Sequence, residues 1–186
     1  MNLLTLFCRS REFRERLGVS RERLYRLAYA WSHDPHLSDD LVQEAMAKAL
    51  KNAGQLRNPK AMNTWLFSIL ANCWRDHFRR ARPTVNVDDI VYCHEDTPER
   101  EHGQHEIVTR VRAAVGQLPL AQRQVLTLVD LEGLSYIEVA EIVDCPIGTV
   151  MSRLSRARRA LKQHLLDLGP AESASPPKLK SVRLVR

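Results

Sequence analysis

The sequence predicts an all-α protein: two small helical domains joined by a flexible acidic linker, with a helix-turn-helix in the second domain. Three observations lead to this prediction. Apolar residues recur at helical spacing through most of the 186 residues, whereas strand-like alternation is scarce. At 83–106 an acidic segment with two prolines and no helical stripe interrupts this periodicity. Near the end of the chain, a capped helix, a break and a basic helix follow one another closely.

Composition narrows the classes of function. The net charge of +6 favours nucleic acid or an anionic surface as partner. Charged residues make up 27% and hydrophobic residues 44%, which indicates a globular chain. The four cysteines lie far apart, so neither a disulfide framework nor a zinc knuckle is predicted, which fits a cytoplasmic location. The apolar start of the chain resembles no signal peptide and is too short to span a membrane, so no membrane insertion is expected.

The first domain, residues 1–82, is predicted to hold three helices around one core. The first helix places four apolar residues on one face: Leu24, Leu27, Ala28 and Trp31. The second is expected to begin at a Ser38 cap and to stop at Gly54. The third is expected to open at Pro59, a favoured first-turn residue, and to run to the end of the domain.

This third helix interleaves aromatic and basic side chains. The aromatic residues are Trp65, Phe67, Trp74 and Phe78, and the basic ones are Arg75, Arg79, Arg80 and Arg82. Aromatic rings stack on unpaired bases and arginines neutralise phosphates, so the pattern predicts binding of single-stranded DNA. Core packing is the alternative for the aromatic rings. Trp65 lies on the apolar stripe and is expected in the core, whereas Trp74 and Phe78 remain open between the two interpretations.

The linker, 83–106, holds seven acidic residues against one arginine, which predicts a flexible connection. Its metal-ligating side chains match no catalytic or structural spacing, so no metal and no cofactor are expected. These side chains are Cys93, His94, His102 and His105. The second domain is predicted to span 107–166. The tail, 167–186, is rich in proline and serine and then basic, and it is predicted to be disordered.

The second domain carries the helix-turn-helix. Ser135 and Glu138 have the spacing of a capping box, residues 144–146 break the helix, and a basic helix follows. Its predicted inner stripe is Ile147, Val150, Leu154, Ala157, Leu161 and Leu165. The N-terminal part of such a helix meets base edges in the major groove, and the positions available for this are Thr149, Ser152, Arg153 and Arg156. Farther along, phosphate contacts are predicted for Arg158, Arg159 and Lys162. A helical hairpin with a purely structural role is the alternative.

Three stretches of the chain together resemble bacterial RNA polymerase sigma factors of the extracytoplasmic-function group. They are DDLVQEAMAKAL, NTWLFSILANCWRDHFRR and LPLAQRQVLTLVDLEGLSYIEVAEIVDCPIGTVMSRLSRARRAL. The resemblance covers roughly residues 20–166 in the order of the family. It implies a sigma factor that binds core RNA polymerase and directs promoter-specific transcription initiation, with the first domain on the unpaired −10 element and the second on the −35 duplex. It also implies an anti-sigma factor as a partner.

The resemblance assigns residues to three surfaces by position. Core polymerase binding falls on Asp39, Asp40, Leu41, Gln43 and Glu44. Binding of the −10 DNA falls on Asn72, Arg75, Arg79, Arg80 and Arg82. Binding of the −35 DNA falls on Thr149, Ser152, Arg153, Arg156, Arg158 and Arg159. For Asp39 and Asp40, ordinary placement of acids in the first turn of a helix is an equal alternative.

Two other functions remain as alternatives. A stand-alone helix-turn-helix regulator would bind duplex DNA without polymerase, usually as a dimer. The arginine-rich aromatic helix argues against it. A metal-dependent enzyme would need the cysteine and histidine cluster of the linker, which has no suitable spacing. Because no nucleophile–base pair or phosphate loop occurs elsewhere, we expect that the protein is not an enzyme.

Overall fold

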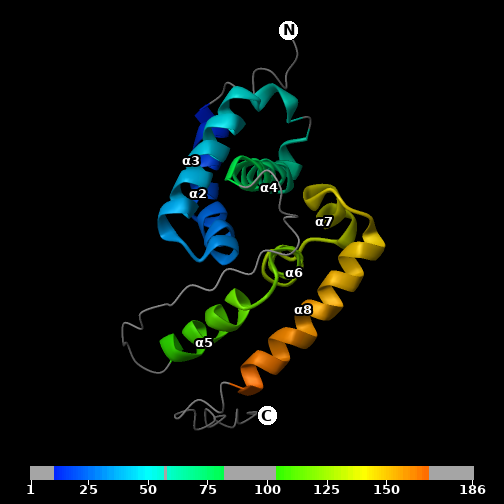
Figure 1. The fold of residues 1–186 in the computed structure, drawn as a ribbon. Coiled ribbons are helices and arrows are strands. Elements are labelled where there is room, and N and C mark those ends of the chain that lie inside the picture. Colours follow the sequence, from blue (N-terminus) through cyan, green and yellow to red (C-terminus); the bar gives the residue numbers. More distant parts are fainter. Residues whose placement is uncertain (1–10, 57, 82–103, 168–186) are drawn as a thin grey trace, which may run out of the picture.

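The computed structural model describes residues 11–56, 58–81 and 104–167, and within these ranges the regular elements are all helical, which confirms the predicted fold class (Figure 1). One group of elements comprises α2 (Arg11–Ser32), α3 (Pro35–Lys51), η1 (Ala53–Gln55), η2 (Pro59–Ala61) and α4 (Met62–Ala81). The other comprises α5 (Gln104–Gly116), α6 (Leu120–Leu126), the π-helical turn η4 (Thr127–Leu131), α7 (Tyr136–Val143) and α8 (Ile147–Asp167). The helix α5 thus begins inside the segment predicted as linker, and 82–103 lie outside the described residues.

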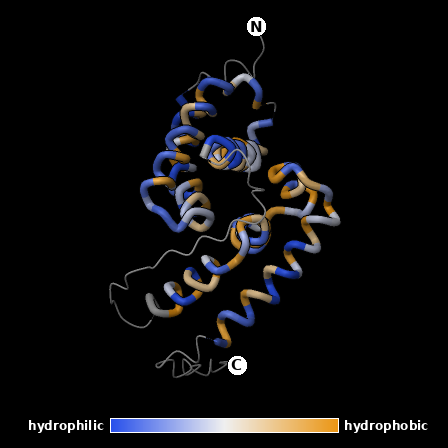
Figure 2. Tube along the Cα trace, viewed as in Figure 1, coloured by the Kyte–Doolittle hydropathy of each residue, from blue (hydrophilic) through white to orange (hydrophobic). Residues whose placement is uncertain are grey.

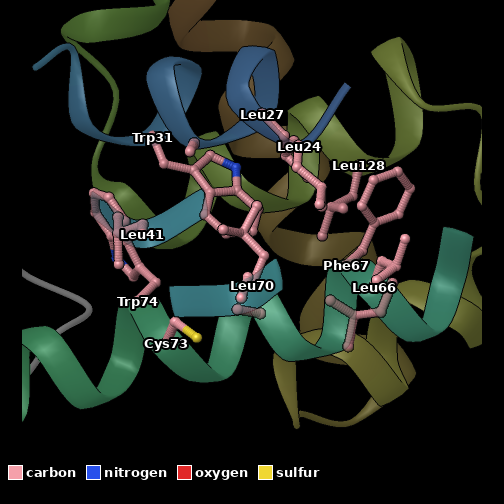
Figure 3. Close-up of a cluster of buried hydrophobic side chains, with 14 of the residues drawn as sticks. Leu24, Leu27, Trp31, Leu41, Leu66, Phe67, Leu70, Cys73, Trp74 and Leu128 are labelled. Atoms are coloured by element: carbon pink, nitrogen blue, oxygen red, sulfur yellow. The ribbon is translucent and has the colours of Figure 1, made fainter. Parts of the chain in front are cut away.

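The helices α2, α3 and α4 form one core because each turns an apolar stripe toward the other two (Figures 2 and 3). Trp31 of α2 and Trp74 of α4 are fully buried and meet edge to face, with ring centroids 5.9 Å apart. Trp74 also contacts Phe78 at 4.8 Å. Aromatic pairs of this kind contribute about 1 kcal/mol beyond the area that they bury.

The start of α3 differs from the prediction. The helix begins at Pro35 with Asp34 as its N-cap, and the Asp34 carboxylate accepts hydrogen bonds from the backbone N–H groups of His36 at 2.8 Å and Leu37 at 3.1 Å. Ser38 is buried in the helix and donates to the Asp34 carbonyl at 2.6 Å. The helix therefore starts one turn earlier, because an aspartate followed by proline provides both a cap and a fixed φ.

The predicted capping box is confirmed at the start of α7. The N–H of Glu138 donates to the Ser135 hydroxyl at 3.3 Å, and the N–H of Ser135 donates to the Glu138 carboxylate at 2.9 Å. The helix ends at Asp144, which takes the left-handed conformation with φ 54° and ψ 56°. The stripe of α8 is confirmed at its centre, but Ile147 is 43% exposed and does not belong to it. The buried stripe consists of Val150, Leu154 and Ala157.

A buried arginine joins the two groups of helices. Arg123 of α6 is fully buried and donates to the backbone carbonyls of Trp31 at 2.6 Å, Gly116 at 2.6 Å and Leu118 at 2.9 Å. Next to it, the Trp31 indole N–H donates to the Thr127 hydroxyl at 2.9 Å. These carbonyls lie at or just beyond the C-termini of α2 and α5, where a helix leaves acceptors without partners. One guanidinium thus fixes the second domain against the first.

No helix in the described ranges combines the length and the apolar character that a membrane span requires.

Candidate nucleic-acid interface

The helix α8 presents its basic side chains away from the core. Its buried stripe faces α6, so Arg156 and Arg159 lie exposed on the opposite side. Within the described part of the chain, neither residue has a hydrogen bond or an ion pair. Thr149 and Ser152 lie nearer the start of the helix, where the Ser152 hydroxyl donates to the Thr149 carbonyl at 3.0 Å. Arg153 is half-buried. The face thus carries side-chain types that can bond base edges and phosphates.

Arg158 differs from its neighbours because it already has a strong partner. Its guanidinium donates to both carboxylate oxygens of Asp130, from Nε at 3.1 Å and from Nη2 at 2.5 Å. Such a forked pair fixes both side chains. Arg158 therefore holds α8 to the end of η4 in this structure and does not point freely toward a ligand.

The second predicted DNA surface lies on α4. Asn72, Arg79 and Arg80 are exposed, and Arg82 lies outside the described residues. Arg79 donates to Asp76 at 3.0 Å, one turn earlier. Arg75 is half-buried and donates to the side-chain carbonyl of Asn72. The structure thus brings four of the five predicted residues together on one helix.

Asn72, Arg75 and Arg79 border a polar cleft of about 600 Å³ between α3 and α4. Lys48 and Asn52 line it from α3 and its end, and Asn72 and Arg75 line it from α4. Lys48 donates to Glu44 at 2.8 Å and to Asp76 at 3.4 Å, and the bond to Glu44 raises the pKa of Lys48 above its ordinary value. The cleft combines amide and cationic groups, which can bond a nucleobase and a phosphate, with the acidic side chains of Asp76 and Asp144.

The aromatic side chains of α4 do not take part in this surface. Phe67, Trp74 and Phe78 are buried in the core, and Trp65 is half-buried against it. Core packing, the alternative that the sequence left open for Trp74 and Phe78, is therefore the outcome for the three buried rings. The sequence does indicate this burial, because Leu70, Trp74 and Phe78 follow one another in steps of four and so lie on one apolar stripe of the helix.

The helix α3 carries the surface assigned to core polymerase. Asp40 and Gln43 are exposed. Asp39 is half-buried and accepts from Arg21 of α2 at 3.1 Å, while Glu44 pairs with Lys48. Leu41 departs from the prediction, because it is only 2% exposed and packs into the core. It supports the helix from inside and offers no side chain to a partner.

The predicted absence of a metal site concerns cysteine and histidine side chains of the segment 83–106. The described ranges contain no group of three or more histidine, cysteine or acidic side chains that could hold a metal ion. Cys93, His94 and His102 lie outside the described residues, and His105 belongs to α5.

Comparison with known proteins extends this picture. A family model described as Sigma-70 region 2 matches residues 20–84, and one described as Sigma-70, region 4 matches 109–161. The chain is 35% identical over 160 residues to the RNA polymerase sigma-H factor of Pseudomonas aeruginosa, covering 80% of this chain and 83% of the relative. It is 37% identical over 151 residues to the ECF RNA polymerase sigma factor EcfG of Rhodopseudomonas palustris, covering 80% and 82%.

Two solved structures share the fold. The sigma factor RpoE of Bartonella quintana, in complex with the anti-sigma factor NepR, matches with a TM-score of 0.66 and 26% identity over 87% of this chain and all of that chain (100%). CnrH, in complex with the cytosolic domain of CnrY, matches with a TM-score of 0.59 and 25% identity over 86% and 90%.

Proposed function

This chain belongs to the extracytoplasmic-function group of the sigma-70 family, and we propose that α3, α4 and α8 each provide one of its binding surfaces. It is a transcription initiation factor that recognises promoters and binds core RNA polymerase. Asp39, Asp40, Gln43 and Glu44 of α3 contact the polymerase. Asn72 and the arginines of α4 hold unpaired −10 DNA, and α8 reads the −35 duplex. The domains of this proposal span 1–82 and 107–166.

The observation that most strongly supports this proposal is the basic face of α8. Arg156 and Arg159 lie exposed on the side of a helix-turn-helix recognition helix that faces away from its own core. A fork of donors on a rigid helix suits guanine in the major groove, while a cation farther along suits phosphate. We assign base reading to Arg156 and phosphate contact to Arg159.

This assignment predicts different losses for two matched substitutions. Arg156→Ala should reduce discrimination between a matched and a scrambled −35 element, because a good bidentate base contact is worth roughly 1–3 kcal/mol. Arg159→Ala should weaken binding to both sequences alike and lower the salt slope by about one. Fluorescence anisotropy of labelled promoter duplexes with the reconstituted holoenzyme measures both. An equal loss on matched and scrambled duplexes for Arg156→Ala contradicts base reading.

The −10 assignment rests on the polar cleft. An unpaired base leaves the stack at a cost of a few kcal/mol, so the protein must offer hydrogen bonds that repay this loss. Asn72 provides both a donor and an acceptor at the rim of the cleft, and Arg79 provides exposed positive charge beside it. Arg80 is exposed at the next position of α4.

Three further parts of the proposal follow from the family. The chain acts by binding and performs no catalysis of its own, which agrees with its match to transcription initiation factors. It works in the cytoplasm, beside the polymerase and the promoter. An anti-sigma factor restrains it, as the solved complex of RpoE with NepR supports. A stand-alone helix-turn-helix regulator is disfavoured, because residues 20–84 match Sigma-70 region 2, a domain that such a regulator does not need.

A further inference from the structure

The helix α8 exposes an apolar side chain beside its basic and hydroxyl side chains. Met151 lies in the second turn of the helix and is 54% exposed. Ile147, one turn earlier, is 43% exposed. Neither residue belongs to the buried stripe through which α8 packs against the rest of its domain. The N-terminal part of the helix that we place in the major groove therefore has an apolar edge in addition to its polar side chains.

Met151 also lines a small hollow where the start of α7 meets α8. The hollow has a volume of about 290 Å³, and its lining residues are Tyr136, Met151, Leu154, Ser155 and Arg158. The charged residue among them, Arg158, is already paired with Asp130. The other lining side chains offer mainly apolar surface, with hydroxyl groups on Tyr136 and Ser155.

Met151 lies on the same exposed surface of α8 as the polar side chains assigned to the −35 element. At about 100° per residue, Met151 and Ser155 project from one flank of the helix, and Ser152 lies between this flank and Arg156. A recognition helix in the major groove turns such a surface toward base edges. Met151 and Arg156, on the two flanks of this surface, are therefore placed to meet different base pairs of the same element.

The chemistry of the side chain indicates which base group Met151 can read. Base edges in the major groove present hydrogen-bond donors and acceptors, and thymine adds an apolar group, its C5-methyl. A thioether has no donor and is only a weak acceptor, so methionine is poorly suited to the polar edges. Its flexible apolar chain packs readily against a methyl group. Single exposed apolar residues are common on protein surfaces, so the position of Met151 on the recognition helix, and not its exposure alone, points to DNA.

We propose that Met151 reads a thymine of the −35 element by packing against its C5-methyl group. This inference rests on the proposed −35 role of α8. Arg156 selects its base through hydrogen bonds, and Met151 adds selection for thymine through apolar contact at a separate base pair. The helix thus combines two kinds of direct readout within one element.

The test replaces thymine by uracil, which lacks only the methyl group and keeps every donor and acceptor of the base. Each thymine of the −35 element, in either strand, is replaced one at a time in a labelled promoter duplex. Fluorescence anisotropy gives the affinity of the reconstituted holoenzyme for each duplex. A difference between thymine and uracil at one position therefore reports contact with the methyl group at that position.

We expect the wild type to bind about fourfold more weakly when uracil replaces the thymine that Met151 contacts. This factor corresponds to about 0.8 kcal/mol, the usual gain from removing one such group from water, at about 1.4 kcal/mol per factor of ten. Met151→Ala should bind the thymine and uracil duplexes equally at this position. Met151→Leu keeps an apolar side chain of similar volume and should retain the preference, whereas the polar Met151→Gln should lose it.

Leu166→Ala is the matched control. Leu166 lies on the same helix, is 64% exposed, and is about 22 Å from Met151 at about 1.5 Å per residue. The control variant should keep the full preference for thymine, because its side chain lies far from the N-terminal part of α8. Each preference is a ratio measured within one variant, so a general change in affinity does not alter it.

Two results overturn the methyl contact. One is a wild type that binds every uracil duplex as tightly as the thymine duplex, and the other is a preference for thymine that persists in Met151→Ala. Discrimination between matched and scrambled −35 elements is measured separately. If the wild type discriminates but its thymine preference does not depend on Met151, the inference is wrong and the −35 role of α8 stands. A wild type that does not discriminate at all contradicts the proposed function itself.

Discussion

At the scale of single residues, the roles of the α8 arginines depend on what each already binds. Arg158 and Arg159 are neighbours in the sequence and both are exposed, yet only Arg158 forms a forked pair with Asp130. A guanidinium that is paired with a carboxylate helps to fix the position of the helix that carries it. Arg159, with no such pair among the described residues, keeps its donors for phosphate.

We therefore predict that Arg158→Ala lowers the melting temperature slightly and leaves −35 discrimination unchanged. Asp130→Ala should have the same effect, because both substitutions remove the same exposed pair. Differential scanning fluorimetry and initiation from matched and scrambled −35 promoters measure the two quantities. A loss of discrimination with Arg158→Ala but not with Asp130→Ala is the opposite result, and it assigns Arg158 to base reading.

At the scale of elements, the capping box links the stability of α7 to pH. Backbone and side-chain hydrogen bonds from Ser135 stabilise the ionised Glu138 carboxylate and hold its pKa below the ordinary value of 4.5. A carboxyl group whose pKa is lowered by folding stabilises the fold above its unfolded pKa, and this contribution disappears as the pH falls through the folded pKa. The cap of α7 is thus complete at neutral pH and lost in acid.

The prediction is that Ser135→Ala costs about 1 kcal/mol of folding free energy at neutral pH, as is usual for loss of an N-cap. Glu138→Gln should also destabilise the protein at neutral pH. Its deficit relative to the wild type should shrink as the pH falls through the lowered pKa of the folded wild-type carboxyl. Urea denaturation across this pH range measures the deficit. A deficit that stays constant to the lowest pH at which the protein folds contradicts the role of the ionised carboxylate.

The elements themselves were largely predictable from the sequence, because apolar periodicity and capping chemistry are local. The capping box at Ser135 follows from residue types alone. The start of α3 was misplaced because Ser38 looks like a cap, whereas Asp34 followed by Pro35 provides a stronger one. The burial of Trp74 and Phe78 was not resolved, because a residue type that packs well also stacks on bases.

At the scale of the whole molecule, the contacts between the two groups of helices were beyond prediction from the sequence. Arg23 and Glu132 are 109 positions apart, and Thr64 and Glu138 are 74 apart. Nothing local marks such pairs, since a charged residue on a helix face looks the same whether it meets solvent or another domain. The contact between the two candidate DNA surfaces appears only in three dimensions.

Arg123 is the residue that holds the two groups of helices together. We predict that Arg123→Ala lowers the free energy of unfolding by about 3 kcal/mol or more, because it leaves three buried carbonyls without their donor, at about 1–3 kcal/mol for each unsatisfied group. Arg112→Ala, an exposed arginine on α5, is the control and should change it by less than about 0.5 kcal/mol. Urea unfolding measures both, and equal losses contradict the central role of Arg123.

The claim that two separate surfaces read two promoter elements is tested most directly by crossing variants with promoters. Wild type, Asn72→Ala and Arg156→Ala are each combined with core polymerase on a promoter that is intact, scrambled at −10 or scrambled at −35, and initiation is measured. We predict that each variant responds less than the wild type to scrambling of its own element, by about 1–3 kcal/mol, and fully to scrambling of the other, because coupling is confined to groups in contact. If both variants respond to both scrambled elements as the wild type does, neither residue reads DNA and the division between α4 and α8 is wrong.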